Sequence, residues 1–149
     1  MAKGYTLIEV LVVIGLLLVI TAVIMPLGVS ILNRQDAKNS SENIKSLIFY
    51  YQQRAYSGDG DSDYIVKFNS SNVQFYKGSD TSTGVLDQTI TLKSGVYIPS
   101  TNLTGGTNEI LFTKNNLLPS SSGTITFTNE GISYLLSINQ EGFMEIYKQ

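Results

Sequence analysis

The chain has 149 residues and a net charge of −2, and 42% of its residues are hydrophobic. This composition is typical of one folded domain with room for an additional apolar segment, and it lacks the basic excess of a nucleic-acid-binding surface. The sequence has no cysteine and no histidine, which excludes disulfides and thiolate metal sites and removes the commonest general base.

The first element in chain order is an apolar stretch with one acid at its start. Between Glu9 and Arg34 no residue is charged, and residues 10–24 are almost entirely Val, Ile, Leu and Ala. About 20 apolar residues in a helix match a hydrocarbon core roughly 30 Å thick. An acid at the mouth of such a helix is costly in lipid, so Glu9 is either a functional residue or an interfacial residue that faces water.

The residues that flank this stretch decide between classes of N-terminal segment. A secretory signal is excluded because the stretch is too long and residues 25–27 lack a small-residue cleavage site. Residues 3–9, Lys-Gly-Tyr-Thr-Leu-Ile-Glu, strongly resemble the processing site of type IV prepilins and pseudopilins. In that family a short basic leader ends in Gly, an aromatic residue follows, and Glu is fifth in the mature chain. Pro26 stands where the family has a proline, and a proline inside a helix kinks or opens it.

The resemblance implies a maturation and an assembly step. A prepilin peptidase would cut after Gly4, and the new amine of Tyr5 would be methylated. Glu9 would then pair with the Tyr5 amine of a neighbouring subunit, and low dielectric would strengthen that attraction. The implied location is a single pass in the cytoplasmic (inner) membrane, with the C-terminal domain outside the cytoplasm, and later an extracellular or periplasmic filament.

The helical pattern continues beyond the apolar stretch into an amphipathic half. Ile44, Leu47, Ile48, Tyr51 and Ala55 recur at helical spacing. One long helix is therefore expected from about residue 6 to residue 56. The predicted divisions are a leader at 1–4, a transmembrane and assembly helix at 5–32, the amphipathic half at 33–57 and a β-rich globular domain at 58–149.

After residue 57 the pattern changes to short runs rich in β-branched and aromatic residues, separated by turn residues. Residues 139–142 are typical of a hairpin loop. The expected class is α+β, with the long helix packed on antiparallel β-sheets as in pilins. The predicted strands are 64–68, 72–76, 85–92, 95–98, 109–113, 123–128, 132–138 and 142–147.

The C-terminal part is similar to the GspH/FimT family of minor pseudopilins and minor pilins. The similarity rests on Glu-Ile-Leu-Phe-Thr at 109–113, the loop at 119–122 and Gly-Thr-Ile-Thr-Phe at 123–127. Main pilins often carry a cysteine pair near the C-terminus, so its absence favours a minor subunit. A major pilin from a cysteine-poor lineage stays open.

Three further groups of residues are candidates for metal binding, nucleic-acid binding or catalysis. Asp59, Asp61 and Asp63 alternate as in the opening of a calcium loop, but Tyr64 and Ser70 stand where an EF-hand needs Gly and Glu. This pattern predicts a solvated turn or, at most, a weak calcium site. The second group is four lysines that are scattered along the chain, which gives no reason to expect a nucleic-acid partner. The third group is a serine run without a His or Cys partner, which predicts no enzyme activity and no cofactor. The lysines are Lys67, Lys77, Lys93 and Lys114, and the serines are Ser120, Ser121 and Ser122.

The sequence therefore predicts a structural subunit of a type IV pilus or a type II secretion pseudopilus. Its expected partners are prepilin peptidase, other pilin or pseudopilin subunits and membrane lipids. The alternative from a different class is a membrane-anchored or filament-tip β module that binds an external ligand such as DNA or a surface. A signal anchor that is never processed is a third interpretation, and the sequence does not distinguish pilus, secretion and DNA-uptake systems.

Overall fold

The structure, a computed structural model, describes residues 6–149, and within residues 23–34 it describes the helical backbone alone. The chain forms two compact units, Met1–Asn33 and Arg34–Gln149. One helix, α1 (Leu7–Ser57), contributes to both units. The helix predicted over residues 6–56 is therefore confirmed, with ends that differ by one residue.

The ends of α1 follow local sequence signals. At the start, the backbone N–H of Glu9 donates to the carbonyl oxygen of Thr6 over 3.1 Å and lies 3.4 Å from its Oγ1, as at a helix N-cap. At the end, Gly58 adopts a φ of 69°, the left-handed conformation that glycine takes at low cost after a last helical turn. A short 3₁₀ turn, η1 (Asp59–Asp61), follows.

The C-terminal part of α1, residues 34–57, buries one stripe of side chains and exposes another. The buried positions are spaced by three and four residues, which is the period of one helix face. The predicted stripe is confirmed except at Leu47, which is only partly buried. The buried residues include Ala37, Ser41, Ile44, Ile48, Tyr51 and Ala55.

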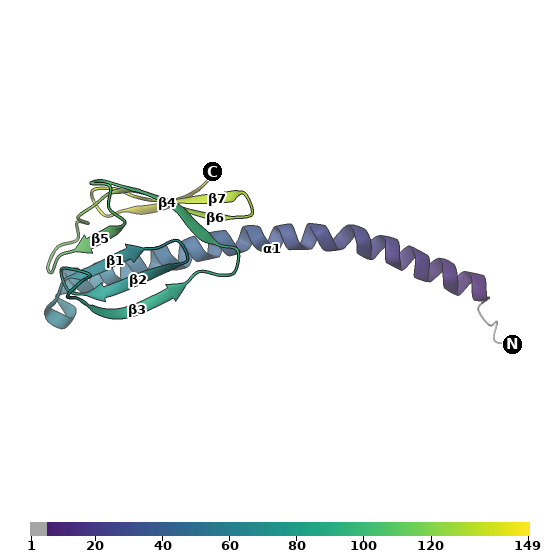
Figure 1. Ribbon diagram of the computed structural model, residues 1–149, viewed down its shortest axis with the longest axis horizontal. Coiled ribbons are helices and arrows are strands. Elements are labelled where there is room, and N and C mark those ends of the chain that lie inside the picture. The colour runs from purple at the N-terminus through teal and green to yellow at the C-terminus, as the bar shows by residue number, and fades with distance from the viewer. Residues whose placement is uncertain (1–5) are drawn as a thin grey trace. The chain divides into compact units, whose positions relative to one another are not determined.

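Two antiparallel sheets lie beside this part of α1 (Figure 1). The first has the order β3-β2-β1-β5 and the second the order β4-β6-β7-β8. The α+β class predicted from the sequence is therefore confirmed. The strands are β1 (Tyr64–Phe68), β2 (Asn72–Lys77), β3 (Val85–Thr91), β4 (Tyr97–Leu103), β5 (Glu109–Phe112), β6 (Gly123–Asn129), β7 (Ile132–Ile138) and β8 (Met144–Lys148).

Both sheets share one hydrophobic core with α1. Tyr51 of the helix stacks on Phe75 of β2, with ring centroids 4.6 Å apart and an interplanar angle of 16°. The second sheet contributes alternate residues of β6 and β7, as expected for strands with one buried face. Its fully buried contributions are Ile125, Phe127, Leu136 and Ile138.

Strand β4 differs most from the sequence prediction, which placed a strand at residues 95–98. The observed strand begins at Tyr97 and continues to Leu103 through Pro99. A proline cannot donate to a ladder, so its presence argued for ending the strand early. Because β4 is the outer strand of its sheet and its register with β6 shifts between Tyr97 and Ser100, the proline is accommodated there.

Strand β3 carries an irregularity that positions one acid. Phe75 pairs with Gln88 and Tyr76 pairs with Leu86, so Asp87 is an extra residue without a counterpart on β2. Such a bulge bends a strand and re-aims side chains. Asp87 thereby reaches α1, where Tyr51 donates to its Oδ2.

The N-terminal unit is described by residues 6–22, all of which are exposed. No helix among the residues that the structure describes is long and apolar enough to cross a membrane. The transmembrane half expected for residues 5–32 stays a prediction from the sequence.

Candidate functional site

The first candidate site is the apolar surface of α1 in the N-terminal unit. Between Leu7 and Ile20 large apolar side chains are exposed around the helix, for example Leu7 at 85% and Leu16 at 58%. The hydroxyl of Thr21 donates to the carbonyl oxygens of Leu17 and Leu18 at 2.9 and 3.0 Å, so its polar hydrogen is used within the helix. A surface of this kind on a folded chain marks a site for a protein partner or for lipid.

Glu9 lies at the N-terminal end of this surface. It is in the first turn of α1, where the helix dipole favours a negative charge. A shallow hollow beside it, lined by Glu9, Val10, Val13 and Ile14, has a volume of about 380 Å³. Among the side chains that the structure describes, those of residues 6–22 and 35–149, no cation forms a salt bridge with its carboxylate. The acid is thus placed on an apolar surface with its charge available to a partner.

Three other predicted site residues are not characterised by the structure. Gly4 and Tyr5, the predicted cleavage site and the predicted partner of Glu9, lie outside the described residues. Pro26 lies within the bounds of α1, but its side chain is not described. The cleavage, the methylation and the kink therefore stay predictions.

The three aspartates after α1 are held by separate donor groups, which belong to Arg54 and Lys114. Arg54 Nε donates to Asp59 Oδ2 at 2.9 Å, and Lys114 forms a salt bridge with Asp61. Asp63 accepts the backbone N–H of Lys114 at 2.7 Å. No group of three or more His, Cys, Asp or Glu side chains in the described part of the chain could hold a metal ion. The structure does not assemble the calcium site that the sequence left open, because each carboxylate turns to its own donor.

The contact with Lys114 also lowers the pKa of Asp61. The hydrogen bond from the Lys114 ammonium, together with its positive charge, holds the pKa of Asp61 below its usual value. The turn is therefore an anchored connection between α1 and the loop after β5.

A cluster around Arg54 fastens α1 to β3, and no motif in the sequence predicts it. The guanidinium bonds Asp59 and, through Nη1, Asp87 Oδ2 at 3.2 Å. It also lies over the ring of Tyr64 at 4.9 Å from the centroid, a cation–π distance. Burial, followed by the hydrogen bond to Asp87, raises the pKa of Tyr51. The helical period does not predict this role for Arg54, because its partner Asp87 lies at a bulge 33 residues away.

A second junction is formed by the buried amide of Gln52. Its Nε2 donates to Leu117 O at 2.7 Å and to Gly142 O at 3.4 Å, so one side chain joins α1 to two loops. Gly142 has a φ of 84°, and a Cβ there would lie 2.2 Å from Gln52 Nε2. The residue must be glycine for the turn between β7 and β8 to approach the helix this closely.

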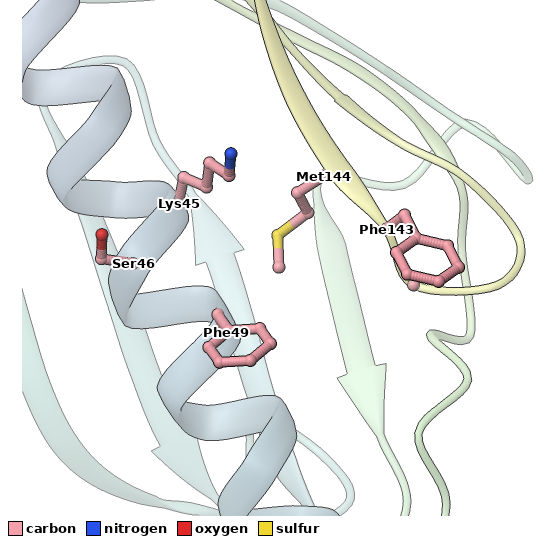
Figure 2. Close-up of a pocket in the computed structure, with 6 residues that line it drawn as sticks. Lys45, Ser46, Phe49, Phe143 and Met144 are labelled. Carbon is pink, nitrogen blue, oxygen red and sulfur yellow. The ribbon is translucent and has the colours of Figure 1, made fainter.

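Beside this junction a groove separates α1 from the β7–β8 turn (Figure 2). Its volume is about 350 Å³. Phe49 is 55% exposed and Phe143 is 70% exposed, while Met144 directs its side chain into the gap. The full lining is Lys45, Ser46, Phe49, Gly142, Phe143 and Met144.

The lysines weighed for nucleic-acid binding are mostly paired with acids. Lys67 bonds Glu109 at 2.7 Å, Lys93 bonds Asp36 at 2.5 Å, and Lys114 bonds Asp61. Pairing of this kind leaves less positive charge for phosphates.

The serine run takes part in loop hydrogen bonds. Ser120 Oγ accepts the backbone N–H of Leu111 at 2.9 Å, and Ser122 Oγ lies 3.1 Å from Thr104 Oγ1. Ser121 is buried. These contacts fasten the chain between β5 and β6.

The comparisons with known proteins establish the fold. No protein-family model matches the sequence, and no curated protein matches it. Among solved structures, the minor pseudopilin EpsH from the Type 2 Secretion System of Vibrio cholerae is similar, with a TM-score of 0.60 over 76% of this chain and 97% of that chain. The two sequences are 12% identical, so the likeness concerns architecture. The chain has a fold like that of a minor pseudopilin, with an N-terminal helix packed on antiparallel sheets.

Proposed function

We propose that this chain is a structural subunit of a type IV pilus or a type II secretion pseudopilus, of the minor GspH/FimT type. The observation that carries the proposal is the combination of two parts. One is a helix whose large apolar side chains are exposed from Leu7 to Ile20, and the other is a domain folded like a minor pseudopilin. The domain has its own closed core, so the helix surface is available for assembly.

Assembly would bury the apolar surface against the helices of other subunits. Before assembly the same surface would contact membrane lipid, and exchanging lipid for helices costs little because both are apolar. We accordingly place the unassembled subunit in the cytoplasmic (inner) membrane, with its domain outside the cytoplasm. Resistance of the unassembled subunit to alkaline carbonate extraction is expected, and its release would contradict this location.

Glu9 would supply the specificity that apolar packing lacks. Its carboxylate has no salt bridge to any side chain of residues 6–22 or 35–149, which are the side chains that the structure describes. An acid that becomes desolvated on assembly needs a cation, and a requirement of that kind fixes the register of one subunit against the next. The proposed cation is the Tyr5 amine of a neighbour, created by prepilin peptidase after Gly4.

The deciding experiment compares two acids on the same helix. Glu9→Val should leave the protein in membranes but remove it from filaments recovered by shearing. Glu42→Val is the matched control, because Glu42 is exposed and bonds only Lys38 at 3.6 Å among its salt bridges in the described residues. It should assemble like the wild type. Equal recovery of the Glu9→Val and wild-type proteins in filaments would defeat the proposal.

Maturation has a separate test. The intact mass of the protein in filaments should lack residues 1–4 and carry one added methyl group. A mass that retains residues 1–4 would show that the N-terminus is not processed, and the Tyr5 amine would then be ruled out as the partner.

A further inference from the structure

The groove between α1 and the β7–β8 turn combines an apolar lining with one available cation. Lys45 forms no salt bridge among the described residues. Its side chain is half-buried and lines the groove (Figure 2). Glu141 adjoins Gly142 on the turn but is not part of the lining. An occupant of this groove should therefore offer apolar side chains and one carboxylate.

The N-terminal unit of the same chain has the complementary surface. The hollow at Glu9 joins one carboxylate to the exposed side chains of Val10, Val13 and Ile14. Glu9 and Val13 are four residues apart, and so are Lys45 and Phe49 on the wall of the groove. Four residues correspond to about 6 Å along a helix. Glu9 with Val13 one helical turn later therefore matches Lys45 with Phe49 one helical turn later in spacing, and the two charges are opposite.

We propose that this groove receives the segment 9–14 of a second copy of the chain, with Glu9 of one copy beside Lys45 of the other. The matched spacing requires the two helices to run parallel, with Val13 against Phe49. The proposal rests on the proposed function, because it names a docking surface for the same assembly helix.

The geometry of such a contact suits a filament. It joins two different surfaces of one chain, so it is heterologous and can repeat along an open helical array instead of closing a symmetric dimer. The copies in such an array keep the same direction along its axis, as the parallel helices require. The contact gives Glu9 a second cation besides the proposed Tyr5 amine, and a carboxylate can accept from both.

Cysteine cross-linking tests the contact directly, because the natural chain has no cysteine. The full-length double variant Val13→Cys with Phe49→Cys, the pair that the proposed register places face to face, should form disulfide-linked multimers in membranes and filaments after mild oxidation. Disulfides require Cα atoms within about 7 Å, so formation reports the proposed register. The matched control is Leu11→Cys with Phe49→Cys, which moves the thiol by about 200° around the helix. It should cross-link roughly tenfold less.

The charge of Lys45 is tested in the cross-linking background. Lys45→Glu should lower the multimer yield by roughly tenfold, whereas Lys45→Arg should retain it. Lys38→Glu, on the same helix but outside the lining, should also retain it. Unchanged unfolding midpoints would confirm that each variant remains folded.

Three results would overturn the inference. They are equal multimer yields from the Val13 and Leu11 variants, no effect of Lys45→Glu, and cross-linking of Phe49→Cys to another protein in place of a second copy. If any of these results is obtained while the wild-type protein still assembles into filaments, the docking contact is ruled out and the proposed function stands. Loss of the Glu9 requirement in sheared filaments is a different outcome, which would defeat the proposed function itself.

Discussion

The two ends of α1 carry their apolar side chains in opposite environments. In residues 7–20 the large apolar side chains are exposed, whereas in residues 37–55 one stripe is fully covered by the two sheets. The apolar residues of the covered stripe have a structural role, because their burial stabilises the domain of the same chain. The exposed surface has no such role in a single copy. The contrast identifies the N-terminal part as the region selected for contacts with something else.

The sharpest test of this contrast makes the same change in both regions. Leu136→Ala, at a fully buried position of β7, should lower the free energy of unfolding by about 2 to 5 kcal/mol because it leaves a cavity. Leu16→Ala, at an exposed position, should change it by less than about 0.5 kcal/mol. Denaturant unfolding of the full chain in mild detergent, followed by tyrosine fluorescence, measures both. A comparable loss in Leu16→Ala would mean that the N-terminal helix supports the domain.

The Gln52 junction tests how far the covered region depends on polar contacts. Gln52→Met keeps the side-chain volume but leaves two carbonyl groups, those of Leu117 and Gly142, without the amide donor. We expect a loss of about 1 to 3 kcal/mol in the free energy of unfolding. Gln53→Met, at the adjacent exposed position, is the control and should be nearly neutral. Equal effects at the two positions would indicate that the junction contributes nothing.

Alkaline pH provides a smaller effect that is specific to the covered region. Tyr51 donates to Asp87, and burial, followed by this bond, raises its pKa above the unfolded value of about 10. Above that pH the unfolded chain loses the proton while the folded chain keeps it, so stability falls as the pH rises. In Tyr51→Phe this contribution disappears, and stability should fall less steeply above pH 10. Identical slopes in unfolding titrations would contradict the assignment.

The smallest effect is expected at the exposed pair of Asp61 and Lys114. The hydrogen bond from Lys114 lowers the pKa of Asp61, so its contribution is present above the usual aspartate pKa of about 4 and is lost as the pH falls below that value. Because the pair is exposed, Asp61→Ala should barely move the melting temperature at neutral pH. Calcium should raise the melting temperature of neither form. A rise in the wild type that Asp61→Ala abolishes would restore the calcium site.

Local sequence patterns predicted most of the fold. The helix follows from the spacing of its buried positions, and β1, β2 and β7 follow from runs of β-branched and aromatic residues between turn residues. Strand β4 was misplaced because Pro99 is a strand breaker in general and is tolerated here by the position of β4 at a sheet edge. The distribution of strands between two sheets could not be read from spacing, since it depends on long-range pairing.

The candidate site was predictable where chemistry is local. Glu9 stands out in the sequence because an acid beside an apolar run is unusual. Arg54 and Gln52 do not, because their partners are brought together only by the fold. The groove with Lys45 was missed for the same reason, since its walls come from α1 and from a turn 97 residues further along the chain.

The bulge in β3 affects how readily the protein can aggregate at high concentration. A free strand edge can recruit strands from other molecules and so start aggregation. At this outer strand the extra residue breaks the even ladder, and its carboxylate is held inward by Tyr51 and Arg54. In the proposed assembly, the helices of neighbouring subunits can then pack closely while this edge of the first sheet resists pairing with strands of other copies.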